Sequence, residues 1–217
     1  MRPWMPLATL VAGIALTLTG CIGAMQTQAV DPVGAGGLVP NQEDKDAGLV
    51  GIASGFELRR YPVIAVDRCA VNDQEIKDDE DRRLAASMPA YFQSETVRQL
   101  RESGVFTRVV NLGETSAPAD AEAWLRLECS VSRLAPGSRA LRYLVGFGAG
   151  RSKAQTELRF VDARASRVMM VTADRRVAAY GFFGGDSEDH LKESFSDMAR
   201  DLAKFLTRLG RGEAPRP

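Results

Sequence analysis

Two stretches of the sequence alternate between apolar and polar residues, and this alternation constrains the fold more than any other feature. The first covers residues 124–131 and the second covers residues 153–161. Because successive side chains of a β-strand point to opposite faces, each stretch predicts a strand with one packed and one solvated face. A polar turn at 162–167 and the apolar residues 168–178 then predict the hairpin partner of the second strand. The chain therefore needs a sheet that is covered on one face.

Two helical segments can supply that cover. The first is predicted to begin near Arg82, or at Ser87 as N-cap with Pro89 in the first turn, and to end at Ser103. Gly104 follows directly and supplies a C-terminal cap, because glycine accepts the left-handed conformation found there.

The last helix is predicted to begin near residues 184–187. It carries one apolar stripe at helical spacing, formed by Leu191, Phe195, Met198, Leu202, Phe205 and Leu209. Further strands are predicted over 61–66 and 105–110. These elements form one domain over residues 53–209. We expect an α+β two-layer sandwich, with a mixed, mostly antiparallel sheet and helices packed on one face.

The N-terminal residues 1–20 have the features of a secretory signal peptide. A single charge, Arg2, precedes the apolar residues 7–18, and a helix of that length measures about 18 Å, too short for a bilayer core of about 30 Å. The following Leu18-Thr19-Gly20-Cys21 resembles the lipobox of bacterial lipoproteins. That resemblance implies cleavage before Cys21 and acylation of its sulfur, palmitate being one such acyl group. The alternative is an ordinary signal or N-terminal anchor that contains a cysteine.

The residues around the predicted domain lack any regular period. Residues 21–52 are rich in glycine and polar side chains and predict a lipidated cysteine followed by a flexible tether. Residues 210–217 predict a frayed tail. Ile22 stands where an Asp would resemble an inner-membrane retention signal, which favours the outer membrane by analogy with enteric bacteria. The domain would then face the periplasm of a Gram-negative bacterium.

The charge balance and the few metal-binding residues argue against several function classes. Lys and Arg together number 28, as do Asp and Glu, which leaves no excess positive charge for nucleic acid. His190 is the one histidine and the three cysteines are scattered, so neither a zinc site nor a histidine-based triad is expected.

Two further motifs also favour plain structural interpretations. The glycine-rich residues 146–152 precede a strand and lack a Lys-Ser/Thr pair, which argues against a nucleotide site. The acidic run 73–81 lacks the glycine turn and spacing of a calcium-binding EF-hand and predicts a solvated loop or helix start. We therefore expect no cofactor, no metal and no catalytic activity.

Cys69 and Cys129 lie on or beside predicted strands. In an oxidising compartment they could form a disulfide if those strands are neighbours, because the two Cα atoms must approach to about 5.5 Å. Two buried free thiols are the alternative.

The hairpin brings two glycine- and aromatic-rich stretches together. If its turn is centred between Arg164 and Ala165, residue i pairs with residue 329 − i, so 141–150 lies beside 178–185. The residues that would gather there are Phe147, Gly148, Gly150, Tyr180, Phe182 and Phe183. They form either an exposed interaction patch or an aromatic cap on the core beneath the last helix.

The segment 136–152, with its PGSRxxRYxxGFGAG motif, is similar to a bacterial lipoprotein domain family of unknown function. The likeness covers roughly residues 55–209, but Ala165-Ser166 stands in the hairpin turn where that family usually has Thr-Gly. More distantly, the arrangement resembles the α/β domains of the curli secretion lipoprotein, the lipoprotein activators of peptidoglycan synthases and the N-terminal domain of the Tol-system propeller protein. Those are binding and assembly modules.

These observations together lead to one expected function and one alternative. We expect an outer-membrane-anchored lipoprotein whose non-catalytic periplasmic domain binds or helps assemble another envelope component. The partner would be an envelope protein, peptidoglycan or lipid. The alternative is a subunit of an oligomeric secretion or pore-like envelope assembly.

Overall fold

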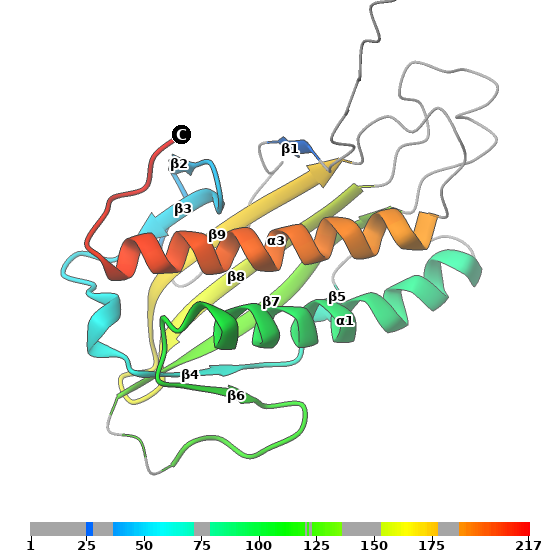
Figure 1. Ribbon diagram of the computed structural model, residues 1–217. Helices are drawn as coiled ribbons and strands as arrows, with labels where there is room; N and C mark the ends of the chain where they lie inside the picture. Colours follow the sequence, from blue (N-terminus) through cyan, green and yellow to red (C-terminus); the bar gives the residue numbers. More distant parts are fainter. Residues whose placement is uncertain are drawn as a thin grey trace, which may run out of the picture.

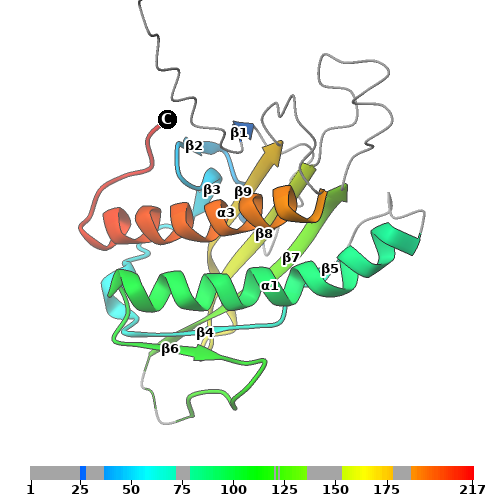
Figure 2. The same ribbon diagram turned by 45° about the vertical axis from the view of Figure 1, so that its right-hand side comes forward.

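The computed structural model describes residues 25–27, 37–71, 79–119, 121, 123–135, 153–177 and 187–217. Within these residues nine strands form one sheet, and two long helices lie side by side over one of its faces (Figures 1 and 2). The predicted α+β fold is confirmed.

The nine strands are numbered in chain order, and the last three are the longest. Their bounds are β1 (Met25–Thr27), β2 (Gln42–Asp44), β3 (Gly48–Ile52), β4 (Val63–Val66), β5 (Ala70–Val71), β6 (Arg108–Asn111), β7 (Trp124–Ala135), β8 (Lys153–Asp162) and β9 (Arg167–Val177). The helices are α1 (Asp79–Ser103) and α3 (Ser187–Gly210), and a short 3-10 helix, η1, covers Leu58–Arg60.

The sheet is mixed, with the order β2-β3-β9-β8-β7-β4-β6. Strand β4 pairs in parallel with both β6 and β7, whereas β7, β8, β9, β3 and β2 pair antiparallel. In addition, β1 pairs with β9 and β5 pairs with β7. All four residues of β4 are buried, as a strand between two neighbours requires.

The alternation in β7 and β8 places one set of side chains in the core. Leu125, Leu127 and Phe160 have no exposed surface, whereas Arg126 and Arg159 are exposed on the opposite face. The apolar stripe of α3 packs against this core, and Phe195 of α3 contacts Phe92 of α1 with ring centroids 5.3 Å apart. The predicted one-sided cover is therefore confirmed.

The hairpin register differs from the predicted one beyond a bulge. Val161 pairs with Val168 and Asp162 with Arg167, which satisfies 329 − i. From Phe160 back to Lys153 the numbers of two paired residues add up to 330 instead of 329, so Lys153 pairs with Val177. The predicted register is wrong for those pairs, because a bulge adds one residue to β9 and shifts every later partner.

Helix α1 begins three residues before Arg82, and Ser87 is not its N-cap. The first three residues of the helix are acidic, and negative charges at this position interact favourably with the positive end of a helix dipole. Ser87 instead donates its hydroxyl to the carbonyl oxygen of Arg83, 3.2 Å away, and Pro89 lies inside the helix. Gly104 ends the helix with φ of 64°, as predicted.

The chain joins the sheet earlier than residue 53, where the predicted tether ended. Residues 42–52 form the β2–β3 hairpin, and β3 pairs with β9. The sequence pattern did not predict these strands, because β2 has only three residues and two of them are exposed. Residues 211–217 also differ from a frayed tail, since the Arg216 carbonyl oxygen accepts a hydrogen bond from the Lys45 amide at 2.9 Å. The Arg216 amide in turn donates to Asp44 Oδ2 at 3.0 Å.

Candidate functional site

Of the candidate site residues predicted from the sequence, the structure describes only the two cysteines of the possible disulfide. Cys21 and the aromatic patch of Phe147, Gly148, Gly150, Tyr180, Phe182 and Phe183 lie outside the described residues. No helix of the described residues is long and apolar enough to cross a membrane. The described residues also contain no group of three or more His, Cys, Asp and Glu side chains that could hold a metal ion.

A disulfide joins Cys69 and Cys129, with their Cα atoms 4.5 Å apart. Cys129 lies on β7 and is 8% exposed, and Cys69 lies in the segment between β4 and β5. Because β4 and β5 both run parallel to β7, the two cysteines lie beside each other across that seam. The bridge closes a loop that contains the whole of α1 and β6.

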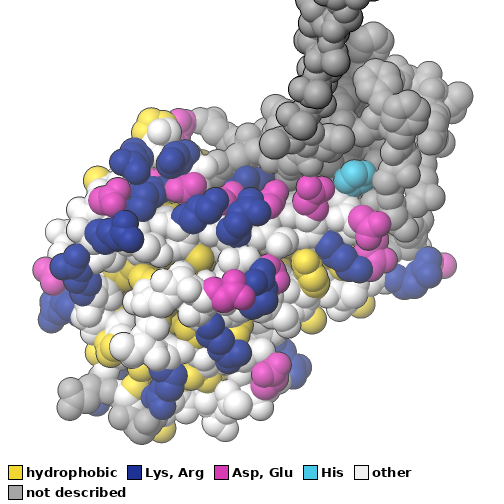
Figure 3. All heavy atoms as spheres, viewed as in Figure 1, with side chains coloured by type: hydrophobic (Ala, Val, Ile, Leu, Met, Phe, Trp, Pro, Cys, Tyr) yellow, Lys and Arg dark blue, Asp and Glu magenta, His cyan; other side chains and the backbone are white. Residues whose placement is uncertain are grey.

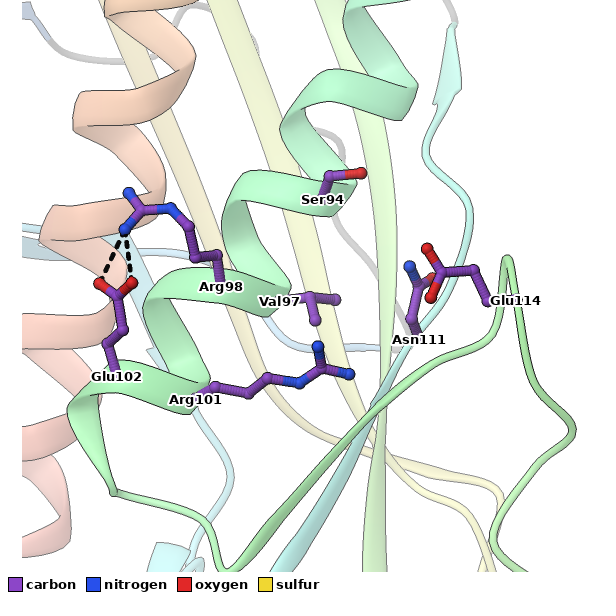
Figure 4. A pocket seen from close by; sticks show the side chains of 7 residues that line it. All are labelled: Ser94, Val97, Arg98, Arg101, Glu102, Asn111 and Glu114. Carbon is purple, nitrogen blue, oxygen red and sulfur yellow. Dashed lines mark hydrogen bonds and ion pairs between the residues drawn. The ribbon is translucent and has the colours of Figure 1, made fainter.

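A groove lies between α1 and β6 on the described surface. We call it the β6 groove, and it measures about 400 Å³. Its lining comes from α1, from β6 and from the turn that follows, and comprises Ser94, Val97, Arg98, Arg101, Glu102, Asn111 and Glu114 (Figure 4). That volume is near the lower end of the usual range for small-molecule sites, about 300–1,000 Å³.

The charged side chains of the β6 groove divide into a paired and an unpaired set. Arg98 turns away from β6 and binds Glu102 through Nη1 at 2.7 Å, and it also pairs with Glu95 (Figure 4). Arg101 extends toward β6, where its Nη2 donates to the carbonyl oxygen of Val109 at 3.3 Å. Among the described residues, neither Arg101 nor Glu114 has an ion-pair partner. The groove therefore presents, within the described part of the chain, one free cation and one free anion.

A buried polar network holds the β6 side of the groove in place. Asn111 Oδ1 accepts hydrogen bonds from Gln93 Nε2 and from the Gly113 amide, both at 2.9 Å. The Asn111 carbonyl oxygen accepts the amides of Glu114 and Thr115, at 3.1 and 2.9 Å. Since Asn111 and Gln93 are each 6% exposed, the network is shielded from water and fixes the turn that carries Glu114.

Gly113 is needed at its position in this turn. A Cβ atom there would lie 3.0 Å from Asn111 Oδ1 and 3.1 Å from Gln93 Oε1, so a larger residue would require these side chains to shift. Arg68, the neighbour of Cys69, donates to the Gly113 carbonyl oxygen at 3.2 Å and joins the turn to the disulfide segment.

Another depression, which we call the α3 groove, lies between the C-terminal halves of the two helices. It measures about 430 Å³ and is lined by Gln99, Glu102, Ser103, Arg200, Ala203, Lys204, Thr207 and Arg208. Basic and acidic side chains interleave over this face of the molecule (Figure 3). Each of the three cations in the groove has an acidic partner: Asp197 and Asp201 for Arg200, Asp201 for Lys204, and Asp44 and Asp46 for Arg208.

Arg208 binds the β2–β3 hairpin to α3. Its Nη2 lies 2.8 Å from Asp44 Oδ1 and 2.8 Å from Asp46 Oδ2. The side chain of Asp44 has no exposed surface. Burial raises the pKa of Asp44 the most, but the hydrogen bonds from Arg208, Arg216 and Asp46 together hold its pKa below 3.8. Asp44 therefore remains ionised at neutral pH.

The part of the chain that carries both the β6 groove and the disulfide matches a known family. A family model described as a domain of unknown function, DUF4410, matches residues 64–181. The chain belongs to the DUF4410 family. The predicted resemblance to a domain family of unknown function is confirmed at that level, and the lipid attachment remains a prediction. No curated protein matches this DUF4410 chain.

This DUF4410 protein also resembles several solved structures in its backbone fold. A single-residue variant of the PelC dodecamer from Paraburkholderia phytofirmans has a TM-score of 0.47 and 18% identity, covering 75% of this chain and 98% of that chain. The PelC dodecamer in another space group has a TM-score of 0.44 and 17% identity, covering 70% and 95%. A DUF330 protein from Xanthomonas campestris has a TM-score of 0.42 and 9% identity, covering 74% and 92%. These likenesses are weak, and the family match places the chain among known proteins.

No pattern in the sequence predicted the β6 groove. Its two free charges lie 13 positions apart in the numbering, one in the last turns of a charge-rich helix and one in a loop. The available signal was Asn111-Leu112-Gly113 after a predicted strand, since Asn and Gly together favour a tight turn. That signal locates the turn but not the helix that faces it.

Proposed function

We propose that this chain is an outer-membrane-anchored lipoprotein, attached through acylated Cys21, whose non-catalytic periplasmic domain binds another envelope component. The observation that carries the proposal is the disulfide between Cys69 and Cys129. Disulfides persist in oxidising compartments such as the periplasm and are rare in the cytosol. A domain built around such a bridge therefore agrees with the export that residues 1–21 predict.

The β6 groove supports a binding role for the domain. It is a concave site with unpaired polar groups on a rigid support, which suits recognition of a small polar group. Its seven lining residues include no histidine or cysteine.

Attachment can be tested by metabolic labelling with palmitate in a Gram-negative host. The wild-type chain should incorporate label and fractionate with the outer membrane. Cys21→Ala should abolish the label, whereas Cys69→Ser should retain it, because only Cys21 follows the lipobox. An unlabelled wild-type chain, or a label that survives Cys21→Ala, would refute lipid attachment at this residue.

Partner binding can be tested by photo-crosslinking in intact cells. Crosslinkers placed at Phe147, at Phe182 or beside the β6 groove should give a reproducible adduct with an envelope protein or with peptidoglycan. The same crosslinker at Arg159, on the opposite face of the sheet from the helices, is the matched control. Adducts of equal yield at all positions would contradict a specific binding surface. A ladder of self-adducts would favour an oligomeric assembly instead.

A further inference from the structure

The two free charges of the β6 groove come from its two opposite walls. Arg101 belongs to α1 and extends toward β6, and Glu114 lies on the turn beyond β6 (Figure 4). Elsewhere on this helix Arg98 already has two acidic partners, and hydrogen bonds to Glu95 and then Glu102 raise its pKa further. Within the described part of the chain, Arg101 and Glu114 are therefore the groups of the groove whose charges remain available to a ligand.

Hydrogen bonds hold both the turn that carries Glu114 and the side chain of Arg101. The Glu114 amide donates a hydrogen bond to the Asn111 carbonyl oxygen at 3.1 Å, and Asn111 is held by Gln93. On the other side, Arg101 is oriented by its hydrogen bond to Val109 of β6. A site whose groups are held before the ligand arrives loses less conformational freedom on binding.

The charges in the groove select the chemistry of the occupant. Two arginines and two glutamates line it, so there is no excess positive charge for a polyanion and no excess negative charge for a polycation. A guanidinium matches a carboxylate in two parallel hydrogen bonds, and a carboxylate accepts from an ammonium group. A ligand that satisfies both free groups at once must carry both charges.

We propose that the β6 groove binds a zwitterionic amino-carboxylate group, with Arg101 on its carboxylate and Glu114 on its ammonium. The inference rests on the proposed function, because in the periplasm such groups are offered by the peptide stems of peptidoglycan and by free amino acids. Ser94 and Asn111 line the same groove and can add hydrogen bonds to the ligand. The volume of about 400 Å³ accommodates one such group and not a folded protein segment.

Calorimetric titration of the full acylated chain in detergent tests this assignment. The probe is meso-diaminopimelate, which carries an amino-carboxylate group at each end, and the single-charge comparisons are glutarate and cadaverine. Each charge-assisted contact is worth about 1.5–3 kcal/mol, so losing one should weaken binding about 10- to 150-fold. We expect that loss for either comparison ligand, and for Arg101→Gln or Glu114→Gln titrated with meso-diaminopimelate.

Matched variants separate loss of the site from loss of the fold. Lys204→Gln removes a cation from the α3 groove and should leave the dissociation constant unchanged. Glu114→Gln should retain the unfolding midpoint, since Glu114 has no ion-pair partner among the described residues, and Arg101→Gln should lower it only by the loss of one hydrogen bond to Val109. Binding of glutarate as tight as that of meso-diaminopimelate, or binding unchanged by either groove variant, would overturn the proposal.

A second arm identifies the source of the ligand. Soluble muropeptides with a free diaminopimelate end should bind more tightly than muropeptides in which that end is cross-linked. Binding of meso-diaminopimelate with no binding of either muropeptide would assign the groove to free amino acids, whereas equal binding of both muropeptides would contradict the role of Glu114. If crosslinking in cells finds an envelope partner but no titration shows binding, the proposed function stands and this inference fails.

Discussion

The two grooves beside α1 are similar in size but opposite in their use of charge. In the α3 groove, Arg200, Lys204 and Arg208 are each neutralised by aspartates of the same molecule. In the β6 groove, Arg101 and Glu114 keep their charges free among the described residues. Ion pairs that are satisfied internally hold elements together, whereas unsatisfied charges are available to a partner. The comparison thus distinguishes the stabilising contacts of α3 from the proposed binding site between α1 and β6.

Removing the disulfide, which lies on the same side of the molecule as the β6 groove, should have the largest effect on the free energy of unfolding. The bridge spans 60 residues, and the chain-entropy relation gives about 4 kcal/mol for a loop of that length. Cys69→Ser with Cys129→Ser should lower the free energy of unfolding in urea by about that amount. Binding in the β6 groove should also weaken, because Arg68 beside Cys69 holds the Gly113 turn.

A reductant should shift the urea midpoint of the wild-type chain in the same direction. The chain with both Cys69→Ser and Cys129→Ser is the control, and its midpoint should not respond to the reductant. A midpoint that does not respond to reductant would show that the bridge contributes little to the fold.

Arg208→Met tests the opposite side of the comparison. The change leaves the fully buried Asp44 side chain without its guanidinium partner, which should cost about 3 kcal/mol at neutral pH. The dissociation constant of meso-diaminopimelate in the β6 groove should be unchanged in the fraction of the variant that remains folded. Lys204→Gln, whose partner is the helix residue Asp201, is the exposed control and should cost under about 1 kcal/mol.

The pH dependence of the Arg208→Met effect follows from Asp44. In the wild-type chain its pKa is lowered below 3.8, so its contribution to stability is complete above that value and is lost as pH falls through the folded-state pKa. Without Arg208 the burial that raises the pKa prevails, and the variant gains stability as pH falls. The difference between the two proteins should therefore shrink from about pH 7 toward about pH 3. A difference that grows on acidification would contradict this account.

Asn111→Ala should disturb the β6 groove with a smaller global cost. Removing Oδ1 leaves the Gly113 amide and one bond of Gln93 unsatisfied in a buried place, at about 2 kcal/mol. The turn that carries Glu114 should loosen, which faster amide hydrogen exchange at residues 113–115 would show. Gln99→Ala, on the side of α1 that faces α3, is the control and should leave the amide exchange at residues 113–115 unchanged. Unaltered exchange in Asn111→Ala would show that the network does not support the groove.

Ser166→Gly should give the smallest effect and change neither groove. Ser166 has φ of 50° in the β8–β9 turn, the left-handed region that glycine adopts without strain. The relief of strain exceeds the entropy that glycine adds to the unfolded chain, so we expect a net gain of about 0.5 kcal/mol. Ala165→Gly at the neighbouring position is the control and should give no gain. A loss of stability in Ser166→Gly would contradict the strain argument.

The elements that could be predicted from the sequence are those whose side chains repeat at a fixed interval. Strands β7 and β8 and helix α3 show their periods over eight or more residues, and the structure has them within a few residues of the expected bounds. The β2–β3 hairpin has no such period, because β2 is short and its one buried side chain, Asp44, is polar. Burial of Asp44 depends on Arg208, which lies 164 residues away in the sequence.

The same limit applies to the sites. The two cysteines could be named as partners from their places near strands, and the structure supplies the parallel seam that brings them together. The β6 groove could not be predicted, since its two walls meet only when α1 lies over the sheet. The register of the β8–β9 hairpin likewise depended on one extra residue in β9, which no local pattern marks.

The contact between Arg208 and the β2–β3 hairpin has a mechanical consequence for a protein held by its N-terminal end. Tension arriving from the N-terminal end would first meet the sheet at the short strand β1, which pairs with β9, and would next reach this hairpin. Asp44 and Asp46 connect the hairpin to α3, the Arg216 amide adds a further bond to Asp44, and β3 is bonded to β9. These contacts tie the hairpin to the helix, the C-terminal segment and the sheet, so detaching the hairpin requires all of them to break. The domain could thereby transmit force between a membrane and a bound partner without unravelling from its attached end.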